Sequence, residues 1–599
     1  MAKRWRFRAH DSELIDRLQR VARLPPVVAQ LLVGRGVAAA ADAERFMNVK
    51  LTGLRDPEEL PGLPAAADRI HQAIQDRRRI VIYGDYDADG MTGTAILLRC
   101  LQLLHANVGY HIPNRIEDGY GLNEDALRQI AQRGPSVVVT VDCGVASVAL
   151  ADFAREAGLE LIITDHHEFA DRLPNAAAIV HPRLPGSNYP FGGLCGAGVA
   201  FKLAWALCQR ACQAKRVSEA MREFLMMAVG IVAIGTVADV VPLVDENRIL
   251  VRHGLESLRL RPTLGLKALI ELTGLSEKPR FASEDIGFTI GPHLNAAGRL
   301  GQAQLGVELL TTESPARAQA LAEYIHELNS SRESLERSIQ LAANKQIKED
   351  FDADNDPAFV LAGRGWHPGV IGIVAGRLAE KHQRPVIVLA LDQLGIKPAT
   401  GSGRSGGVID LHAALGACSE HLLSHGGHAA AAGLKLEESK LPAFRAAFCE
   451  QVSCMISRES LTPELEIDAE TPLAQLSLRT VEQIEQLSPF GAGNPRPLLC
   501  ATGLQLAEPP KRMGNGERHL TLRVVQEQTS LRAVGFGLAD WVDELVQHDG
   551  PLDLAFRPVI NTFRGQSRVE LHLVDWRPSN RATSTCATGS PPGPASLRE

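Results

Sequence analysis

The sequence predicts an α/β protein with two α/β lobes, a long helix between them and a C-terminal β domain. In the first half, apolar β-branched runs alternate with helical patterns, which indicates a parallel sheet covered on both faces. A polar stretch without glycine then predicts the long connecting helix. Short alternating runs near the C-terminus predict antiparallel strands that form an OB-fold-like β domain, plausibly a small barrel.

The domain boundaries follow from changes in these patterns. We expect three or four domains, because 599 residues exceed the size of one ordinary core of about 100–200 residues. The expected order is a helical N-terminal preface (1–50), a first α/β lobe (51–312), the connecting helix (313–350), a second α/β lobe (351–458), the β domain (459–578) and a disordered tail (579–599).

Composition and charge exclude several classes of protein. The net charge of −7 argues against a surface coated in positive charge that binds duplex DNA without specificity, although it leaves room for a local basic groove. No segment reaches the roughly 18 apolar residues of a membrane span, and residues 225–238 are predicted to form a buried helix or strand. Ten cysteines without a C-x-x-C pair and a basic N-terminus without an apolar core indicate a cytoplasmic protein.

Polar residues follow each predicted strand of the first lobe. The strands at 79–83, 137–141 and 159–164 end in GD, DCG and DHH respectively. Ligand sites of open α/β sheets lie beyond the carboxyl ends of their strands. These side chains should therefore gather along one edge of the sheet.

The segment GDYDADG places Asp85, Asp87 and Asp89 within five residues. Carboxylates at this spacing repel one another unless a cation neutralises them, although a solvated turn is an equally open interpretation. A calcium-binding EF-hand loop is excluded, because its twelfth position requires Glu and is Ile96 here.

Further candidate ligands are Asp142, the triplet Asp165-His166-His167 and Asp239. Carboxylates with imidazole suit Mn²⁺, Fe²⁺ or Zn²⁺, and a mainly carboxylate set favours Mn²⁺ or Mg²⁺. Asp239 ends an apolar stretch in which an unpaired charge would be costly to bury; an N-cap or a salt bridge would account for that residue alone. Taken together, four acidic strand ends and a His pair predict a two-metal site suited to hydrolysis of a phosphoester.

The motifs GDYDADG, VDCG, TDHH and GTVADVVPL, in that order, resemble the four motifs of the DHH phosphoesterase superfamily. The later stretches GPHLNAAGRL, WHPGVIGIVAGRL, GSGRS, GGHAAAAG and LSPFGAGNPRP are similar to those of its bacterial single-strand-specific exonucleases. The resemblance covers residues 50 to 577 and implies a DHH lobe, a DHH-associated lobe and an OB-fold-like domain.

The resemblance also implies roles for individual residues. The implied metal ligands are Asp85, Asp87, Asp89, Asp142, His166 and Asp239, with Asp142 bridging two ions and Asp85 binding directly or through water. Asp142, Asp165 and His167 are implied as catalytic, with His167 at the scissile phosphate. The implied nucleic-acid or phosphate contacts are Asn295, Arg299, Trp366, His367, Ser402, Arg404, Ser405, Gly427, His428, Lys511 and Arg512.

Several of these contacts have a plain structural alternative. Taken alone, GSGRSGG is typical of a flexible loop, and Trp366 with His367 could form a packed turn. Lys511 and Arg512 are expected in a loop of the β domain that could be merely solvated. Tyr83 and His293 depart from the family pattern, since many relatives have His and Arg at these positions. The family also usually has acidic residues just after GRL, where this chain has Gly301 and Gln302.

We therefore expect a 5′→3′ exonuclease that acts on single-stranded DNA in repair and recombination. It would use two Mn²⁺ or Mg²⁺ ions and release 5′-mononucleotides. The alternatives are a DHH phosphodiesterase for small substrates such as nano-RNA or cyclic dinucleotides, and a non-catalytic single-strand-binding scaffold. From the resemblance we expect a monomer that acts away from membranes, with a single-strand-binding protein and a RecQ-like helicase as partners.

Overall fold

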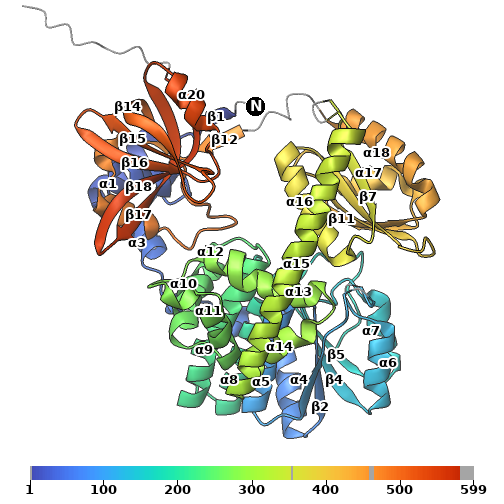
Figure 1. Cartoon of the computed structure of the whole chain (residues 1–599). Coiled ribbons are helices and arrows are strands. Elements are labelled where there is room, and N and C mark those ends of the chain that lie inside the picture. Colours follow the sequence, from blue (N-terminus) through green and yellow to red (C-terminus); the bar gives the residue numbers. More distant parts are fainter. Residues whose placement is uncertain (1–2, 116, 120, 353–354, 457–463, 580–599) are drawn as a thin grey trace, which may run out of the picture. The chain divides into compact units, whose positions relative to one another are not determined.

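The computed structural model describes residues 3–115, 117–119, 121–352, 355–456 and 464–579 (Figure 1). The described chain forms two compact units. One contains residues 49–456 and 489–495, and the other contains residues 3–48, 464–488 and 496–579. The predicted disordered tail lies outside the described residues, except for Ser579.

The first lobe is built on a five-stranded sheet in which every pair is parallel, as predicted. The strand order is β3 (Val108–His111), β2 (Arg79–Gly84), β4 (Ser136–Val141), β5 (Glu160–Thr164) and β6 (Ala178–Val180). The central strands are buried almost throughout, which explains their continuous β-branched sequences.

Helices cover both faces of this sheet (Figure 1). Alternate strand residues belong to two separate cores. One core includes α4 (Leu63–Gln75) and α5 (Ala88–Leu103), and the other includes α6 (Glu124–Gln132) and α7 (Val148–Glu156). The sheet is therefore the middle layer, and its carboxyl edge remains available for a site.

A helical layer completes the first lobe. Its helices are α8 (Gly196–Cys212), α9 (Glu219–Ala238), α10 (Asp245–Leu260), α11 (Leu264–Leu272), α12 (Ser283–Asp285), the π-helical turn η4 (Ile286–Ile290), α13 (Gly291–Arg299) and α14 (Ala303–Thr311). By length and composition alone α9 could cross a membrane, but over half of its apolar window is buried inside the protein, as in a core helix. Asp239 caps the end of α9, so the expectation that it ends a strand was wrong.

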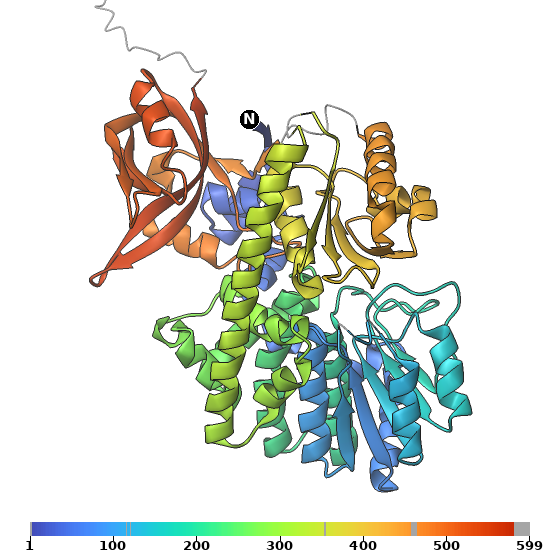
Figure 2. The ribbon, with the colours of Figure 1, turned by 45° about the vertical axis from the view of Figure 1, so that its right-hand side comes forward.

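The predicted connecting helix is α15 (Pro315–Asp350), a single helix that runs from the first lobe to the second (Figures 1 and 2). Ser314 caps its start by accepting a hydrogen bond from the N–H of Arg317. Its buried residues contribute first to the core of the first lobe and then to that of the second. The two lobes therefore share one rigid element.

The second lobe has a mixed sheet. Its strand order is β10 (Ser424–Gly427), β11 (Ala431–Leu436), β9 (Ala399–Arg404), β8 (Val386–Leu391) and β7 (Phe359–Arg364), and only β7 and β8 are parallel. The helices α16 (Pro368–His382), α17 (Leu411–Ala417) and α18 (Leu441–Met455) cover it.

The C-terminal unit contains a closed barrel, as the alternating runs predicted. The strands β14 (Leu499–Met513), β15 (His519–Gln526), β16 (Thr529–Gly535), β18 (Gln566–Pro578) and β17 (Leu552–Phe563) follow one another, and β17 pairs back with β14. The expectation of antiparallel strands was wrong for one of these pairs, since β16 and β18 are parallel.

The N-terminal segment differs from the helical preface that the sequence suggested. Besides α1 (Ser12–Ala22), α2 (Pro26–Val33) and α3 (Ala40–Met47), it forms the strand β1 (Arg4–Phe7). This strand pairs in parallel with β12 (Glu464–Ile467), and Trp5 packs into a cluster of the barrel unit. The segment therefore belongs to the C-terminal unit. The sequence could not predict this pairing, because the partner strand lies about 460 residues away and no local pattern indicates it.

A buried ion pair holds the helical layer of the first lobe together. Lys202 on α8 and Glu246 on α10 are fully buried, and the Lys202 Nζ lies 2.5 Å from a carboxylate oxygen of Glu246. Lys202 also donates to the carbonyl of Arg55 at 2.7 Å, and the Tyr189 hydroxyl donates to Glu246. Every charge in this cluster thus has a partner inside the core.

Replacing Glu246 by Ala should lower the free energy of unfolding of the first lobe by about 3–5 kcal/mol, because Lys202 would remain buried without a counter-charge. Urea unfolding followed by circular dichroism measures this change. The control is Glu349→Ala, which removes an exposed carboxylate 3.8 Å from Lys345 and should cost less than about 1 kcal/mol. Equal losses in the two variants would contradict the assignment.

Candidate metal centre

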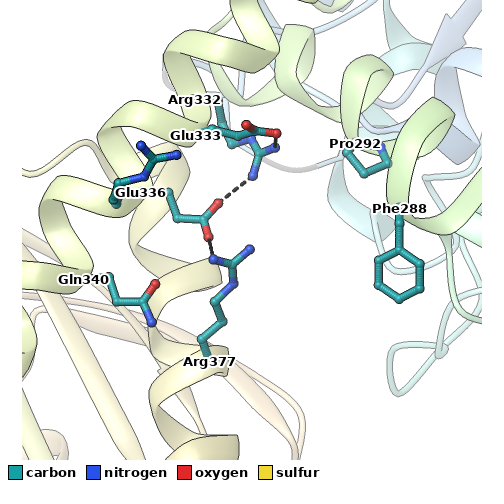
Figure 3. A pocket seen from close by; sticks show the side chains of 8 residues that line it. Phe288, Pro292, Arg332, Glu333, Glu336, Gln340 and Arg377 are labelled. Carbon is teal, nitrogen blue, oxygen red and sulfur yellow. Dashed lines mark hydrogen bonds and ion pairs between the residues drawn. The ribbon is translucent and has the colours of Figure 1, made fainter. Parts of the chain in front are cut away.

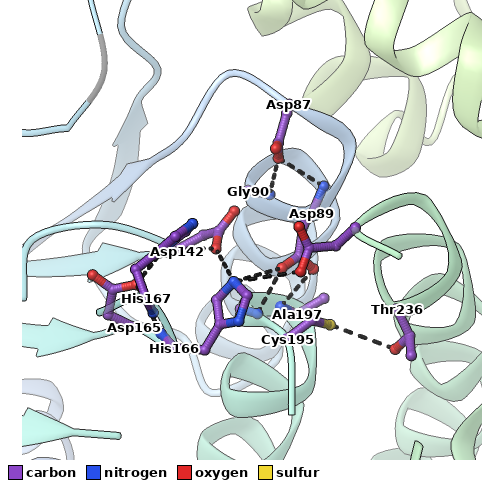
Figure 4. A network of polar contacts seen from close by, with 12 residues as sticks. Asp87, Asp89, Gly90, Asp142, Asp165, His166, His167, Cys195, Ala197 and Thr236 are labelled. Carbon is purple, nitrogen blue, oxygen red and sulfur yellow. Dashed lines mark hydrogen bonds and ion pairs between the residues drawn. The ribbon is translucent and has the colours of Figure 1, made fainter. Parts of the chain in front are cut away.

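Acidic and imidazole side chains meet at the carboxyl edge of the parallel sheet (Figure 4). Asp85 and Asp87 follow β2, Asp142 follows β4, and His166 and His167 follow β5. Asp89 lies in the first turn of α5, and Asp239 reaches the same place from the end of α9. The structure thus brings all six predicted ligands together with His167.

These side chains form three overlapping groups whose ligand atoms lie within 4.8 Å of one another. The groups are Asp85-Asp87-Asp142, Asp89-His166-Asp239 and Asp142-His166-His167. The Nε2 atom of His166 lies 3.1 Å from Asp142, 3.5 Å from Asp239 and 3.8 Å from Asp89. Because Asp142 and His166 each belong to two groups, the arrangement offers adjoining positions for two cations.

The donor set fits divalent cations. Asp85 Oδ1 and His166 Nε2 are buried and have no hydrogen-bond donor or acceptor among the described residues. Buried polar atoms of this kind are costly unless something satisfies them. Four or five carboxylates with one or two imidazoles are the ligands that Mn²⁺ and Mg²⁺ prefer.

Burial and mutual repulsion raise the pKa values of several carboxylates in this cluster. Burial first, and then the charges of Asp89 and Asp87, raise the pKa of Asp239 to about 9. Burial and the charge of Asp87 raise the pKa of Asp89 to about 6 and that of Asp85 well above its ordinary value. Burial and the neighbouring carboxylates raise the pKa of Asp142 as well. Cations in this position would remove the repulsion.

Backbone N–H groups hold the carboxylates in place. Asp87 caps α5 by accepting hydrogen bonds from the N–H groups of Asp89 (2.9 Å) and Gly90 (3.0 Å). Asp89 accepts from Gly196 (2.6 Å) and Ala197 (2.9 Å) at the start of α8. A Cβ on Gly196 would lie 2.6 Å from the side chain of Asp142, so only glycine permits this approach.

Asp165 positions His167 instead of joining the ligand groups. Its carboxylate accepts hydrogen bonds from the N–H groups of Val145, His166 and His167 and lies 2.8 Å from Nδ1 of His167. Burial alone would lower the pKa of His167, but the hydrogen bond and the charge of Asp165, followed by the charges of Asp239 and Asp87, raise it to about 9. His167 is therefore held in a fixed orientation, and Asp165 favours its protonated form.

The predicted phosphate-binding residues of α13 lie beside this centre. Asn295 accepts a hydrogen bond from the N–H of Ala88 at 2.9 Å, next to Asp87. Arg299 donates to the carbonyl of Gly369 at the start of α16, at 3.0 Å. Burial, followed by the charges of Arg115, Arg332 and Arg404, lowers the pKa of Arg299 to about 10.

Ser402 and Arg404 of the second lobe lie on β9 against α16, the helix whose first turn meets Arg299. The Arg404 guanidinium donates to the Ser402 hydroxyl at 3.1 Å and to the carbonyl of Gly403 at 2.7 Å. Burial, followed by the charge of Arg115, lowers the pKa of Arg404. Both lobes thus contribute guanidinium groups near the metal centre.

Other predicted contacts have local structural roles. Trp366 packs over Gly363, and His367 caps α16 by accepting a hydrogen bond from the N–H of Gly369. Ser405 is buried and accepts from the N–H of Gly407. Gly427 has a φ of 140° where a Cβ would strike the carbonyl of Ala431, so it shapes the turn that exposes His428.

Lys511 and Arg512 lie on β14, so the expectation of a loop was wrong for them. Lys511 lies 3.6 Å from Glu508, and Arg512 donates to Asp543 at 2.8 Å. The turn begins only at Gly514, where φ becomes positive. The strand continues to Met513, whereas the two charged residues had suggested that it ended before Lys511.

Two departures from the family pattern, Tyr83 and His293, lie outside the ligand groups. Tyr83 is fully buried, and its hydroxyl donates to the carbonyl of Gly121 at 3.3 Å. His293 accepts or donates a hydrogen bond at 3.0 Å to His326 on α15, and the two rings stack. Neither substitution disturbs the carboxylate cluster.

Sequence reasoning missed several residues that support the centre. Arg115 lies over the ring of Tyr86 and influences both Arg299 and Arg404. Arg183 donates to the carbonyl of His166 at 2.7 Å. The N–H donors of Gly196 and Ala197 had a signal, since the glycine-rich stretch FGGLCGAG (191–198) spans the start of α8.

Comparison with known proteins agrees with this fold and site. Residues 79–231 match the DHH family N-terminal domain, residues 355–453 match the DHHA1 domain and residues 467–575 match the RecJ OB domain. A sheet-edge cluster of carboxylates with a His pair, in a DHH domain joined to a DHHA1 domain, defines a DHH phosphoesterase.

Relatives narrow the class further. The chain is 38% identical to the single-stranded-DNA-specific exonuclease RecJ of Bacillus subtilis, over 96% of this chain and 70% of that protein. It is 35% identical to the RecJ of Escherichia coli, over 92% of this chain and 95% of that protein. The chain belongs to the RecJ family.

A solved structure leads to the same family. The crystal structure of Thermus thermophilus RecJ in complex with Mn²⁺ matches with a TM-score of 0.81 and 30% identity, over 96% of this chain and 80% of that one. A second structure of that protein, in complex with Mg²⁺, matches with a TM-score of 0.75, over 79% of its length.

Stabilisation by Mn²⁺ should increase with pH. The raised pKa values of Asp89 (about 6) and Asp239 (about 9) mean that protonation stabilises the metal-free protein below about pH 4, and that this contribution is lost as pH rises through those values. Cations compete with these protons, so the gain in Tm from Mn²⁺ over EDTA should be larger at about pH 8 than at about pH 6. Thermal unfolding at both pH values measures it, and a gain that falls with pH would contradict the cluster's role.

Proposed function

We propose that this protein is a metal-dependent exonuclease specific for single-stranded DNA, which degrades its substrate from the 5′ end and releases 5′-mononucleotides. The observation that carries the proposal is the convergence of Asp85, Asp87, Asp89, Asp142, His166 and Asp239 at one sheet edge. The names of the RecJ relatives support single-stranded DNA as the substrate. The expected polarity rests on the resemblance of the motifs.

The carboxylates of the ligand groups and His166, without His167, would hold two Mn²⁺ or Mg²⁺ ions, with Asp142 shared between them. When bound, such ions supply a water of lowered pKa and neutralise charge on a phosphodiester. The chain itself contributes fixed carboxylates, because backbone donors already hold Asp87 and Asp89 before any substrate arrives. No side-chain nucleophile is required, so we expect no covalent intermediate.

His167 would donate a hydrogen bond to the scissile phosphate. Its Nδ1 is directed at Asp165, which leaves Nε2–H of the imidazolium for a phosphate oxygen. Asp165 is thus a positioning residue, although the sequence had suggested a catalytic role for it. Asn295 would keep the Asp87 loop in place while Arg299 and Arg404 bind the backbone of the strand.

The alternatives are less well supported. An enzyme for nano-RNA or cyclic dinucleotides has no need of the closed barrel of the C-terminal unit, which matches the RecJ OB domain and suits single strands. A non-catalytic scaffold has no need of a complete set of metal ligands in which buried atoms such as Asp85 Oδ1 make no hydrogen bond among the described residues.

We further propose that the protein acts as a monomer in the cytoplasm, in DNA repair and recombination. A single-strand-binding protein and a RecQ-like helicase are its proposed partners. The resemblance of the motifs supports these proposals. Pull-down of each purified partner by the full chain tests them directly.

Asp142→Ala should reduce cleavage of single-stranded DNA by at least about a thousandfold while leaving DNA binding largely intact, because it removes the ligand shared by both cations. The assay is a time course on long strands blocked at the 5′ or the 3′ end. Asp171→Ala removes an exposed carboxylate from the loop after His167 and should retain activity.

The same assay separates the alternatives. Long strands left whole by the wild-type protein would indicate a small-substrate enzyme or a scaffold, and degradation of 5′-blocked strands would contradict the polarity. Near wild-type cleavage by the Asp142→Ala variant in excess Mn²⁺ would contradict the two-metal assignment.

Asp165→Asn should shift the alkaline limit of activity to lower pH. In the wild-type protein the protonated form of His167 is lost as pH rises through about 9. Without the charge of Asp165, its pKa should fall toward the ordinary value of about 6.5. The pH profile of kcat at saturating Mn²⁺ measures the shift, and an unchanged profile with a uniformly lower kcat would contradict the positioning role.

A further inference from the structure

A short segment from the C-terminal part of the chain belongs to the first compact unit. Residues 489–495, from the motif LSPFGAGNPRP, lie in that unit, whereas the chain on either side of them belongs to the other unit. The segment forms a tight turn, in which the N–H of Gly491 donates to the carbonyl of Asn494 at 2.9 Å and the N–H of Asn494 donates back at 3.2 Å. Asn494 is buried, and its side-chain amide closes the turn by donating to the carbonyl of Pro489 at 2.8 Å.

This turn holds residues 240–244, the loop that follows the proposed ligand Asp239. The N–H of Leu243 donates to the carbonyl of Ala492 at 2.7 Å. A Cβ on Gly491 would lie 2.7 Å from the side chain of Leu243, so glycine permits the close approach of the two segments. The loop is therefore fixed four residues beyond Asp239.

Val240 shows that this course is imposed on the loop. Its φ is 59°, a left-handed conformation that is costly for a β-branched residue. Val240 is 70% exposed, so packing of its side chain does little to offset that cost. Such conformations persist where the surrounding chain determines them, and they cluster at functional sites. Here α9 fixes one side, because the N–H of Asp239 donates to Gly235 at 2.9 Å, and the turn fixes Leu243 on the other.

The same loop is tied to a second ligand. Asn247 is fully buried, and its side-chain amide donates to the carbonyls of Pro242 at 3.0 Å and Gly193 at 2.6 Å. Gly193 lies three residues before α8, whose first N–H groups hold Asp89. Asp89 and Asp239 belong to the same ligand group. The contacts of the loop therefore converge on that group.

The helical layer supports the segment and α9 together. The Ser283 hydroxyl at the start of α12 donates to the carbonyl of Phe490. The π-helical turn η4 follows α12, and a Cβ on Gly291 at its end would lie 3.3 Å from that of Ala238 in the last turn of α9. Phe288 of the same turn is 82% exposed and lines a cavity of about 400 Å³ instead (Figure 3). The buried side of η4 is thus the side that packs against α9, in a kind of turn that is frequent at functional sites.

We propose that residues 489–495 position Asp239 for the cation of the group that it shares with Asp89 and His166. Asp239 itself would bind the cation, and the segment limits the directions that its carboxylate can take. This inference deepens the proposed function and rests on its metal centre. The ligand group that includes Asp85 comes from the ends of β2 and β4 and does not depend on the segment. One of the two cation positions should therefore respond to changes in the turn.

Isothermal titration calorimetry of the full chain with Mn²⁺, in the absence of DNA, tests the proposal. The wild-type protein should bind two ions. Asn494→Ala opens the turn, and Val240→Gly lets the loop move independently of Asp239. Each should weaken the binding of one ion by about 10- to 100-fold, as expected for groups that orient a metal ligand, and leave the other unchanged. The controls are Asn344→Ala, which removes a hydrogen bond to a backbone carbonyl of α15, and Gln213→Gly, at the exposed end of α8 where φ is 50°. Both should bind two ions like the wild-type protein.

Thermal unfolding in EDTA separates positioning from folding. Glycine adopts a left-handed φ at little cost, so Val240→Gly should unfold within a few degrees of the wild-type protein and still bind one ion more weakly. Unchanged affinity for both ions in both variants, equal weakening of both ions, or weakening only where the unfolding temperature also falls would overturn the inference. A wild-type protein that binds no Mn²⁺ would overturn the proposed function as well. One that binds two ions without cleaving single strands would overturn the proposed function alone.

Discussion

Repulsion among buried carboxylates is the constraint on which the rest of the first lobe depends. Asp85, Asp89 and Asp142 are almost fully buried at one sheet edge, and Asp239 lies against them. A chain that needed only stability would replace such groups by apolar ones. Their presence is explained by cations, and backbone N–H groups hold two of the carboxylates, Asp87 and Asp89, in place.

The scaffold around the centre follows from that requirement. Parallel strands deliver Asp85, Asp142 and Asp165 to the same edge, whereas an antiparallel sheet would send alternate strand ends to opposite edges. The start of α8 contributes N–H donors to Asp89, and a helix N-terminus favours negative charge. Asp142 adopts a left-handed φ of 66°, which is uncommon outside glycine and which its neighbours must hold in place.

Much of this arrangement could be predicted from the sequence, because strand ends are local features. Each of Asp85, Asp142 and Asp165 directly follows an apolar run. In a parallel sheet the ends of these strands meet at one edge, so the position of the three residues could be predicted. Other features depend on contacts between distant segments. The pairing of β1 with β12 and the approach of Arg299 to Gly369 have no local pattern. The direction in which the carboxylate of Asp165 turns, toward His167, could not be read from its position in the triplet.

The position of the arginines explains how an acidic protein can act on DNA. Two divalent cations would raise the formal charge of −7 by four, and they would do so at the point where the phosphodiester must approach. Arg115 lies close enough to lower the pKa values of both Arg299 and Arg404, so positive potential is concentrated in one region instead of being spread over the surface. A duplex-binding protein relies on many dispersed phosphate contacts, and its affinity falls steeply with salt. A concentrated cluster of guanidinium groups needs fewer contacts, and this suits a single-stranded substrate without a basic surface.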